Sequence, residues 1–267
     1  MCIRDRRNTK LIDSAKAKNT RVLLTISSHG RNNNDIFLED ENKWITLIDS
    51  VSTLINYRNA DGVDINFENL PYFKRTEFNR FIKEMRENLD FKLNKKAFIS
   101  VTLPALNGRE IYDVREIQKH VDLMVIMGYD YNNDIVYQEQ GAVAPLQSSE
   151  SNNLSLKSTL DFYINKGINV SKTILALPYY GSMWEGQIDN NGEIESRIER
   201  KVTYSEVMNL MKSELVFNPS SIPIFDETSM TNYMNFIYPD MTSKEIWFDD
   251  DYTLGKKYDF AISKKLK

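Results

Sequence analysis

The sequence predicts an α/β fold built around a parallel β-sheet. Short apolar runs alternate with segments in which apolar residues recur every three or four positions, as they do in successive βα units. The chain of 267 residues has the length of one large domain, and its 41% hydrophobic residues are enough for a substantial core. Together these observations favour a single large sheet with helices packed against it.

Five short apolar runs are the strand candidates, at residues 21–27, 61–68, 96–103, 121–129 and 172–179. Helices with one apolar face are expected between these runs, at about residues 44–55, 78–89, 109–119 and 156–168. Runs of this length, bounded by polar or turn residues, are typical of strands buried in a parallel sheet. About five strands are fewer than the eight that a closed barrel requires.

The alternation stops after residue 180. Residues 181–244 are mostly polar, with a turn signal at 189–192 and one expected helix at 204–212. Because this stretch holds few apolar residues, we expect it to lack a hydrophobic core of its own. We therefore interpret about 182–244 as an insertion on the main sheet, followed by a last helix near 252–265.

Composition and charge exclude several classes of partner. The net charge of −4 argues against nucleic acid or an anionic membrane, because both attract a basic surface. Cys2 is the only cysteine, and the two histidines, His29 and His120, are far apart in the sequence, so we expect no disulfide, metal or cofactor. The acidic run at 249–251 is expected to be a solvated loop. No apolar stretch approaches the roughly 18 residues of a membrane span.

The second predicted strand, 61–68 (DGVDINFE), carries the most informative pattern. Because alternate side chains of a strand share a face, its apolar set should pack under the helices: Val63, Ile65 and Phe67. Its polar set should share the opposite face: Asp64, Asn66 and Glu68. Glu68 ends the strand, and active sites of parallel barrels lie at the carboxyl ends of their strands. A polar plug with every group hydrogen-bonded is the structural alternative to catalysis.

Three ordered motifs carry a family resemblance. Residues 61–68 have the form D-x-x-D-x-N-x-E, residues 127–130 (MGYD) have the form M-x-Y-D, and residues 27–30 read SSHG. Together they resemble glycoside hydrolase family 18, the chitinase family, whose motifs are D-x-x-D-x-D-x-E, M-x-Y-D and S-x-G-G. Asn66 stands where that family has its third aspartate, and His29 stands where it has a glycine.

Longer stretches resemble one branch of the family. Residues 127–146 and 177–184 are similar to the bacterial branch that includes spore-cortex and germination hydrolases. Residues 245–250 (EIWFDD) are similar to the segment that leads into the last strand of the family fold. The resemblance covers nearly the whole chain from Arg21 onward.

The resemblance implies a (β/α)8 TIM barrel with the insertion between strands 7 and 8. The first two strands of the family fold should precede Arg21 and its eighth should follow Lys267, so we expect a barrel truncated at both ends. The opening residues, 1–7, resemble translated adapter DNA and are set aside as an artefact, which leaves 8–267 as the partial barrel domain.

The resemblance also implies an activity. Family 18 enzymes cleave β-1,4 linkages of glycans that contain N-acetylglucosamine, such as chitin, chitooligosaccharides or peptidoglycan-like polymers, by substrate-assisted retaining catalysis. Glu68 would protonate the glycosidic oxygen, and burial beside Asp64 would favour its protonated form. Tyr129 would orient the acetamido group and Asp130 would bind the distorted sugar. Such a glycan substrate implies that the full-length protein is secreted or belongs to the cell envelope.

Asn66 leaves two readings of the activity open. Its amide oxygen can accept the hydrogen bond of the expected aspartate but carries no negative charge, and losing such a charge can cost about 3 kcal/mol. We expect retained hydrolase activity, with a catalytically impaired carbohydrate-binding barrel as the alternative. An unrelated barrel enzyme, such as a deacetylase or an aldolase, is disfavoured because the sequence offers no metal ligands and no lysine at a strand end.

Three further residues are candidates for contact with the substrate. Met127 belongs to the M-x-Y-D motif, and Tyr180 and Trp184 follow a predicted strand end, where their rings can stack on sugars. A role for these aromatic residues in capping the core is equally open. Trp44 and Trp247 are interpreted as structural. His29 could line the site from its strand end, but we favour its interpretation as a hydrogen-bonded loop histidine.

Overall fold

The computed structural model describes residues 9–132, 140–148, 154–188, 194–217 and 222–267. The chain divides into two compact units, the first formed by Met1–Val125 with Lys166–Thr173 and the second by Ile126–Asn165 with Ile174–Lys267. Over the residues described, no helix has the length and apolar character needed to cross a membrane.

The first sheet has five strands among the described residues, in the order β1-β2-β3-β4-β5. Their bounds are Leu23–His29 (β1), Gly62–Glu68 (β2), Phe98–Leu103 (β3), Leu123–Met127 (β4) and Thr173–Ala176 (β5). The β1–β2 and β2–β3 pairs are parallel. All five predicted strands are therefore confirmed, with their ends displaced by at most three residues.

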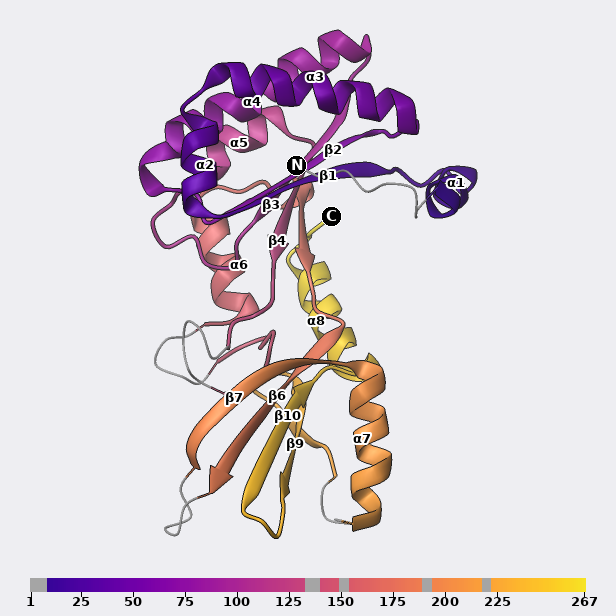
Figure 1. Ribbon diagram of the computed structural model, residues 1–267, viewed down its shortest axis with the longest axis vertical. Helices are drawn as coiled ribbons and strands as arrows, with labels where there is room; N and C mark the ends of the chain where they lie inside the picture. Colours follow the sequence, from indigo (N-terminus) through magenta and orange to yellow (C-terminus); the bar gives the residue numbers. More distant parts are fainter. Residues whose placement is uncertain (1–8, 133–139, 149–153, 189–193, 218–221) are drawn as a thin grey trace. The chain divides into compact units, whose positions relative to one another are not determined.

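Helices alternate with these strands, as the periodicity predicted. They are α2 (Arg31–Leu38), α3 (Glu41–Arg58), α4 (Arg75–Leu93), α5 (Val114–His120) and α6 (Leu156–Asn165), with short 3-10 turns η1 (Tyr72–Lys74) and η2 (Val170–Lys172). Helices α3, α4 and α5 lie together on one side of β1, β2 and β3 (Figure 1). Two helices were not predicted, α2 and α1 (Thr9–Ala17). Three consecutive asparagines in α2 give it weak intrinsic helix propensity, so the sequence alone carries little signal for it.

The apolar face of β2 forms the centre of the core in the first unit. Its side chains are almost completely buried, with exposed fractions of 0% for Val63, 0% for Ile65 and 3% for Phe67. Phe81 of α4 stacks on Phe67 with ring centroids 5.6 Å apart, and Trp44 of α3 packs edge-to-face on Phe81. The predicted alternation along β2 and the structural role of Trp44 are both confirmed.

Asp61, the first aspartate of the motif, anchors the start of β2. Its carboxylate accepts hydrogen bonds from Lys16 Nζ at 2.6 Å and from the Val22 backbone N–H at 2.7 Å. Burial opposes ionisation, but these two hydrogen bonds outweigh it and lower the pKa of Asp61. Gly62 follows because a Cβ at this position would lie 1.7 Å from the Phe98 carbonyl oxygen. Asp61 and Gly62 therefore fix the start of β2, and with it which residues of the strand lie on the polar face.

The second unit contains an antiparallel sheet in the order β7-β6-β10-β9-β8. Its strands are β6 (Tyr180–Ile188), β7 (Ile194–Thr203), β8 (Ile224–Asp226), β9 (Thr231–Ile237) and β10 (Thr242–Phe248). Helix α7 (Tyr204–Phe217) lies along this sheet, as Figure 1 shows. The sheet extends beyond the predicted insertion of 182–244 at both ends.

A hydrophobic core fills the space between this sheet and α7. Its buried members are Met183, Val202, Val207, Met234, Phe236, Ile246 and Phe248. The prediction that this segment lacks a core of its own is therefore wrong. Buried residues alternate with more exposed ones along β9, at Met234 and Phe236, and at the end of β10, at Ile246 and Phe248, so a few apolar residues on one face of the sheet suffice for this core.

The acidic run at 249–251 is also different from its prediction as a solvated loop. The Asp249 carboxylate lies 2.6 Å from Lys257 Nζ, and the two side chains are 5% and 0% exposed. Asp250 caps α8 (Asp251–Ser263) by accepting a hydrogen bond from the Thr253 backbone N–H at 2.8 Å. Two of the three aspartates thus join β10 to α8, and only Asp251 is exposed.

We expect Lys257→Met to lower the free energy of unfolding by about 3–5 kcal/mol, because it leaves the Asp249 carboxylate buried without a counter-charge. Urea denaturation measures this change. The matched control is Lys256→Met on the same helix, for which we expect a change of less than about 1 kcal/mol. Equal losses in the two variants would contradict a special role for the buried pair.

Candidate functional site

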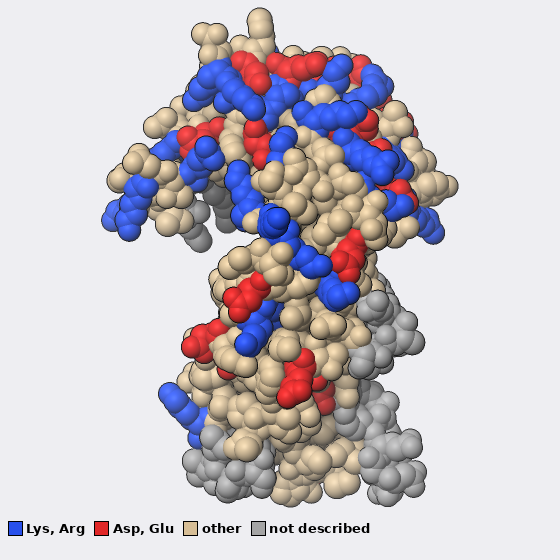
Figure 2. Space-filling model, turned by 180° about the vertical axis from the view of Figure 1, so that it is seen from behind, with Lys and Arg blue, Asp and Glu red and all other residues tan. Residues whose placement is uncertain are grey.

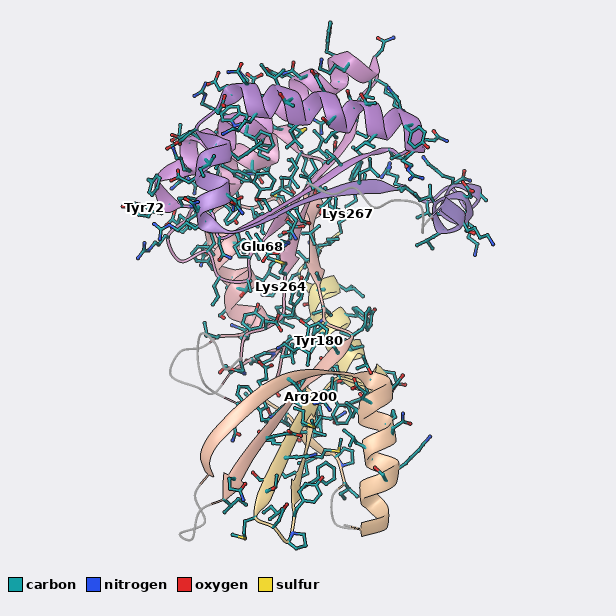
Figure 3. The ribbon with its side chains drawn as sticks, viewed as in Figure 1. Glu68, Tyr72, Tyr180, Arg200, Lys264 and Lys267 are labelled. Carbon is teal, nitrogen blue, oxygen red and sulfur yellow. The ribbon has the colours of Figure 1, made fainter. Side chains whose placement is uncertain are left out.

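The polar face of β2 presents three side chains in a row, and Glu68 ends that row at the carboxyl end of the strand (Figure 3). Asp64 is held from the neighbouring strand: its Oδ1 accepts a hydrogen bond from Ser100 Oγ at 2.6 Å, and Thr102 Oγ1 lies 3.4 Å away. The parallel register pairs Asp64 with Ser100. These contacts fix the Asp64 carboxylate on the same face as Glu68, four residues earlier along β2.

Glu68 is partly accessible, with one third of its side chain exposed (33%). Its Oε1 accepts a hydrogen bond from Asn66 Nδ2 at 3.2 Å and lies 3.2 Å from His29 Nδ1. His29 is the last residue of β1 and is the register partner of Glu68, so the prediction of a loop histidine is wrong. Asn66 and His29 therefore meet the same carboxylate oxygen.

Asn66 also provides an unused acceptor. Its Oδ1 is buried and has no hydrogen-bond partner among the described residues. A buried amide oxygen without a partner costs free energy, on the order of 1–3 kcal/mol, unless a ligand or water satisfies it. The geometry thus leaves one acceptor beside Glu68 for an incoming N–H group.

Two side chains fix the backbone on either side of Glu68. Asn34 Nδ2 of α2 donates to the Glu68 carbonyl oxygen at 2.5 Å, and Tyr112 Oη donates to the Phe67 carbonyl oxygen at 2.5 Å. Burial and then the negative charge of Glu68 raise the pKa of Tyr112, so its phenol stays protonated and remains a donor. These two side chains therefore hold the end of β2 beyond Ile65, the last residue paired with β3.

A second polar cluster lies in the second unit, just beyond β4. Asp130 has a left-handed backbone conformation (φ 59°) and accepts a hydrogen bond from Tyr180 Oη at 3.0 Å. The Tyr129 ring packs edge-to-face on Tyr180 with centroids 6.3 Å apart. Burial, followed by the charge of Asp130, raises the pKa of Tyr180. The structure thus brings Tyr180, predicted from a later segment, onto the Tyr129–Asp130 pair of the M-x-Y-D motif.

Lys201 of β7 joins this cluster and was not predicted. Its Nζ lies 2.9 Å from Asp130 Oδ1 and 2.5 Å from Glu199 Oε1. Burial acts to lower the pKa of Lys201, but the hydrogen bonds to Glu199 and Asp130 outweigh it and raise the pKa. The ammonium group therefore stays charged between two carboxylates and fixes the orientation of Asp130.

The two remaining predicted substrate contacts differ in exposure. Met127 ends β4 and is half-buried, on the strand face opposite the buried Met124 and Ile126. Trp184 is 2% exposed, so it offers no ring face to a sugar in this conformation. The predicted stacking on Trp184 conflicts with this burial, because β6 places the residue inside the sheet between Glu199 of β7 and Glu245 of β10.

Trp247 packs within the second unit, in line with its structural interpretation. Its ring stacks on Tyr233 at 4.7 Å, and its Nε1 donates to Glu245 Oε1 at 2.6 Å. These three residues border a cavity of about 610 Å³. The aromatic pair is thus partly accessible from that cavity.

Sequence reasoning missed several of these residues for different reasons. Ser100 and Thr102 alternate with apolar residues on β3, and this parity was a usable signal. Asn34, Tyr112 and Lys201 gave no such signal, because each meets its partner through a contact between segments distant in sequence. No group of three or more His, Cys, Asp or Glu residues within the described ranges could hold a metal ion.

Opposite charges are mixed on the helices of the first unit. On the face shown in Figure 2, Lys and Arg side chains are interspersed with Asp and Glu. Lys92 lies 2.7 Å from Asp49, which links α4 to α3, and Lys83 lies 3.7 Å from Glu87 on α4. This pattern is that of an ordinary solvated surface.

Comparison with known proteins gives a family match over nearly the whole chain. The model of the family described as "Glycosyl hydrolases family 18" matches residues 4–267. A probable chitinase 2 from Drosophila melanogaster is 31% identical over 140 residues, covering 50% of this chain and 28% of the relative. The class V chitinase CHIT5 from Lotus japonicus is 26% identical over 263 residues, covering 92% of this chain and 64% of the relative. The chain therefore spans less than two thirds of the length of either relative.

Solved structures share the fold. The C-terminal domain of a putative chitinase from Desulfitobacterium hafniense has a TM-score of 0.80 at 21% identity, covering 99% of this chain and 77% of that one. A putative sporulation-specific glycosylase, ydhD from Bacillus subtilis, has a TM-score of 0.77 at 19% identity, covering 97% of this chain and 82% of that one. The spore cortex-lytic enzyme SleL from Bacillus megaterium has a TM-score of 0.78 at 17% identity, covering 96% of this chain and 57% of that one. The predicted TIM-barrel class and the likeness to the spore-associated branch are confirmed.

Proposed function

Because the chain belongs to glycosyl hydrolases family 18, we propose that it cleaves β-1,4 linkages in glycans that contain N-acetylglucosamine, with Glu68 as the general acid. The observation that carries this proposal is the polar row of β2, which ends on a partly exposed carboxyl group at the carboxyl end of a parallel strand. Around this group the described side chains supply one N–H donor on Asn66, the His29 Nδ1 nitrogen at 3.2 Å and one free acceptor.

The proposed reaction has two steps, and Glu68 serves both. Glu68 first donates a proton to the glycosidic oxygen while the carbonyl oxygen of the substrate's own N-acetyl group attacks the anomeric carbon. The bond between the anomeric carbon and the glycosidic oxygen breaks, the leaving sugar departs with a free hydroxyl, and an oxazolinium ion remains. The ionised Glu68 then takes a proton from water, whose oxygen attacks the same carbon and opens the ring. Two displacements at one carbon retain its configuration.

Asn66 has a defined part in this scheme. Its unpartnered Oδ1 accepts a hydrogen bond from the acetamido N–H, while its Nδ2 stays on Glu68. The amide thereby orients the nucleophilic carbonyl, but it adds no negative charge to stabilise the oxazolinium ion. We infer that the chain is a slower enzyme than one with a carboxylate at this position.

Family membership supports a role for the second cluster in the same reaction. We propose that Tyr129 orients the acetamido group and that Asp130 binds the distorted sugar, with Tyr180 and Met127 as further substrate contacts. Lys201 and Tyr180 support this by holding the Asp130 carboxylate from two directions. The assignment of Trp184 as a substrate contact requires a change of its buried conformation.

The family and named neighbours support the proposed substrate class. A mutant class V chitinase from Nicotiana tobaccum, solved in complex with NAG4, has a TM-score of 0.79 to this chain at 17% identity. The spore-associated neighbours favour peptidoglycan-like polymers as a second possibility within the same class. Both kinds of glycan lie outside the cytoplasm, so we propose a secreted or cell-envelope protein.

Asn66 also favours a second candidate function. Without the expected aspartate, the same residues can hold an N-acetylated glycan and release it uncleaved, as a carbohydrate-binding barrel. The two candidates differ in turnover and agree on the ligand.

We expect Glu68→Gln to abolish hydrolysis of an N-acetylglucosamine hexamer, because the amide has no acidic proton to donate, while calorimetry still detects binding. The matched control is Glu84→Gln on the exposed face of α4, which should keep wild-type turnover. Turnover close to wild type in the Glu68 variant would remove Glu68 from the mechanism.

We expect Asn66→Asp to raise kcat on the same oligomer by up to about a hundredfold, because it restores the charge that stabilises the oxazolinium ion. Binding should change less than rate, since the hydrogen bond to the acetamido group is present in both forms. Steady-state kinetics across pH measure the effect. Two forms that bind the oligomer and are equally inactive would favour the carbohydrate-binding function.

A further inference from the structure

His29 and Glu68 are brought together by the register of the sheet. The two residues are direct partners on neighbouring parallel strands, and Ser27 and Asn66 are partners two positions earlier on the same face. Neighbouring strands lie about 4.8 Å apart, so long side chains at paired positions can touch. The 3.2 Å separation between His29 Nδ1 and Glu68 Oε1 follows directly from this pairing.

We propose that His29 is a positioning residue for the general acid, which holds Oε1 of Glu68 so that the catalytic proton stands on Oε2. This inference rests on the proposed function of Glu68. Oε1 faces two nitrogen atoms, Asn66 Nδ2 and His29 Nδ1, each at 3.2 Å. Within the first unit, no described side chain hydrogen-bonds to Oε2.

The arrangement decides which oxygen carries the proton. Oε1 accepts the hydrogen bond of Asn66 Nδ2 and lies 3.2 Å from His29 Nδ1, so both of its lone-pair directions face nitrogen. The single proton of the neutral carboxyl group therefore belongs on the other oxygen. Oε2–H then donates to the glycosidic oxygen, and the ionised Oε2 later receives the proton of water. His29 and Asn66 keep their protons throughout, so the pair orients Glu68 without exchanging a proton with it.

The turn after β1 strengthens this role. Gly30 follows His29 with φ of 145°, a backbone conformation that L side chains rarely adopt, and leads directly into α2. Four residues further on, Asn34 donates to the Glu68 carbonyl oxygen. Residues 29–34 therefore hold Glu68 at its side chain and at its backbone.

The imidazole also has the exposure that a test requires. Its side chain is 58% exposed, so a small molecule can reach the space left by its removal. The other histidine, His120, ends α5 and serves as a matched control, because it is the same residue type outside the polar row.

The kinetic experiment compares His29→Gly, His29→Asn and His120→Asn on an N-acetylglucosamine hexamer. We expect His29→Gly to lower kcat about ten- to a hundredfold with little change in KM, because misplaced catalytic groups cost rate more than binding. Added imidazole should restore part of that loss, and His29→Asn should keep most of the activity, since its amide can donate in place of Nδ1. Wild-type or higher turnover in His29→Gly, or a loss that neither imidazole nor asparagine reduces, would overturn the proposal.

A second measurement does not depend on turnover. ¹⁵N NMR of the neutral imidazole should place the proton of His29 on Nδ1 in the wild-type protein and move it to Nε2 in Glu68→Ala. If the wild-type chain cleaves no oligomer but this tautomer change occurs, the hydrolase function fails while the contact stands. A wild-type proton on Nε2, or a tautomer that is unaffected by Glu68→Ala, would contradict the positioning role.

Discussion

The period-two alternation of β2 is the constraint on which the rest of the site depends. One face of this strand supplies the buried centre of the core, with Val63, Ile65 and Phe67 beneath the helices. The other face must then carry Asp64, Asn66 and Glu68, and a slip of one residue would exchange the two sets. Asp61 and Gly62 fix that register at the start of the strand, so the position of the proposed acid is set by packing far from it.

The alternation could be predicted from sequence because it is a local property of one strand. The five parallel strands, helices α3 and α4, and the polar row were predictable for this reason. The second sheet was not, because its apolar residues form a core only after five segments have assembled. The same holds for three residues that contact their partners only in the folded chain: Asn34, Tyr112 and Lys201. Their spacing in the sequence does not predict these contacts.

Charge is the feature in which this site differs from the motif of its family. With Asn66 in place of the aspartate, the side chains around Glu68 are an amide and an imidazole, and both meet Oε1 through nitrogen. This arrangement would orient the proposed acid, but the amide of Asn66 adds no negative charge to stabilise an oxazolinium ion. Preorganised geometry and reduced electrostatic stabilisation are thus combined in one site, which is consistent with a slow hydrolase and with a binding protein that has descended from one.

The most direct test of the account is the configuration of the first product formed from an N-acetylglucosamine hexamer, followed by NMR alongside the matched glucosamine hexamer. Substrate-assisted catalysis predicts that the β-anomer appears first and that the glucosamine oligomer, which has no acetamido carbonyl, is not cleaved. Initial release of the α-anomer, or equal cleavage of both oligomers, would contradict the mechanism proposed for the end of β2.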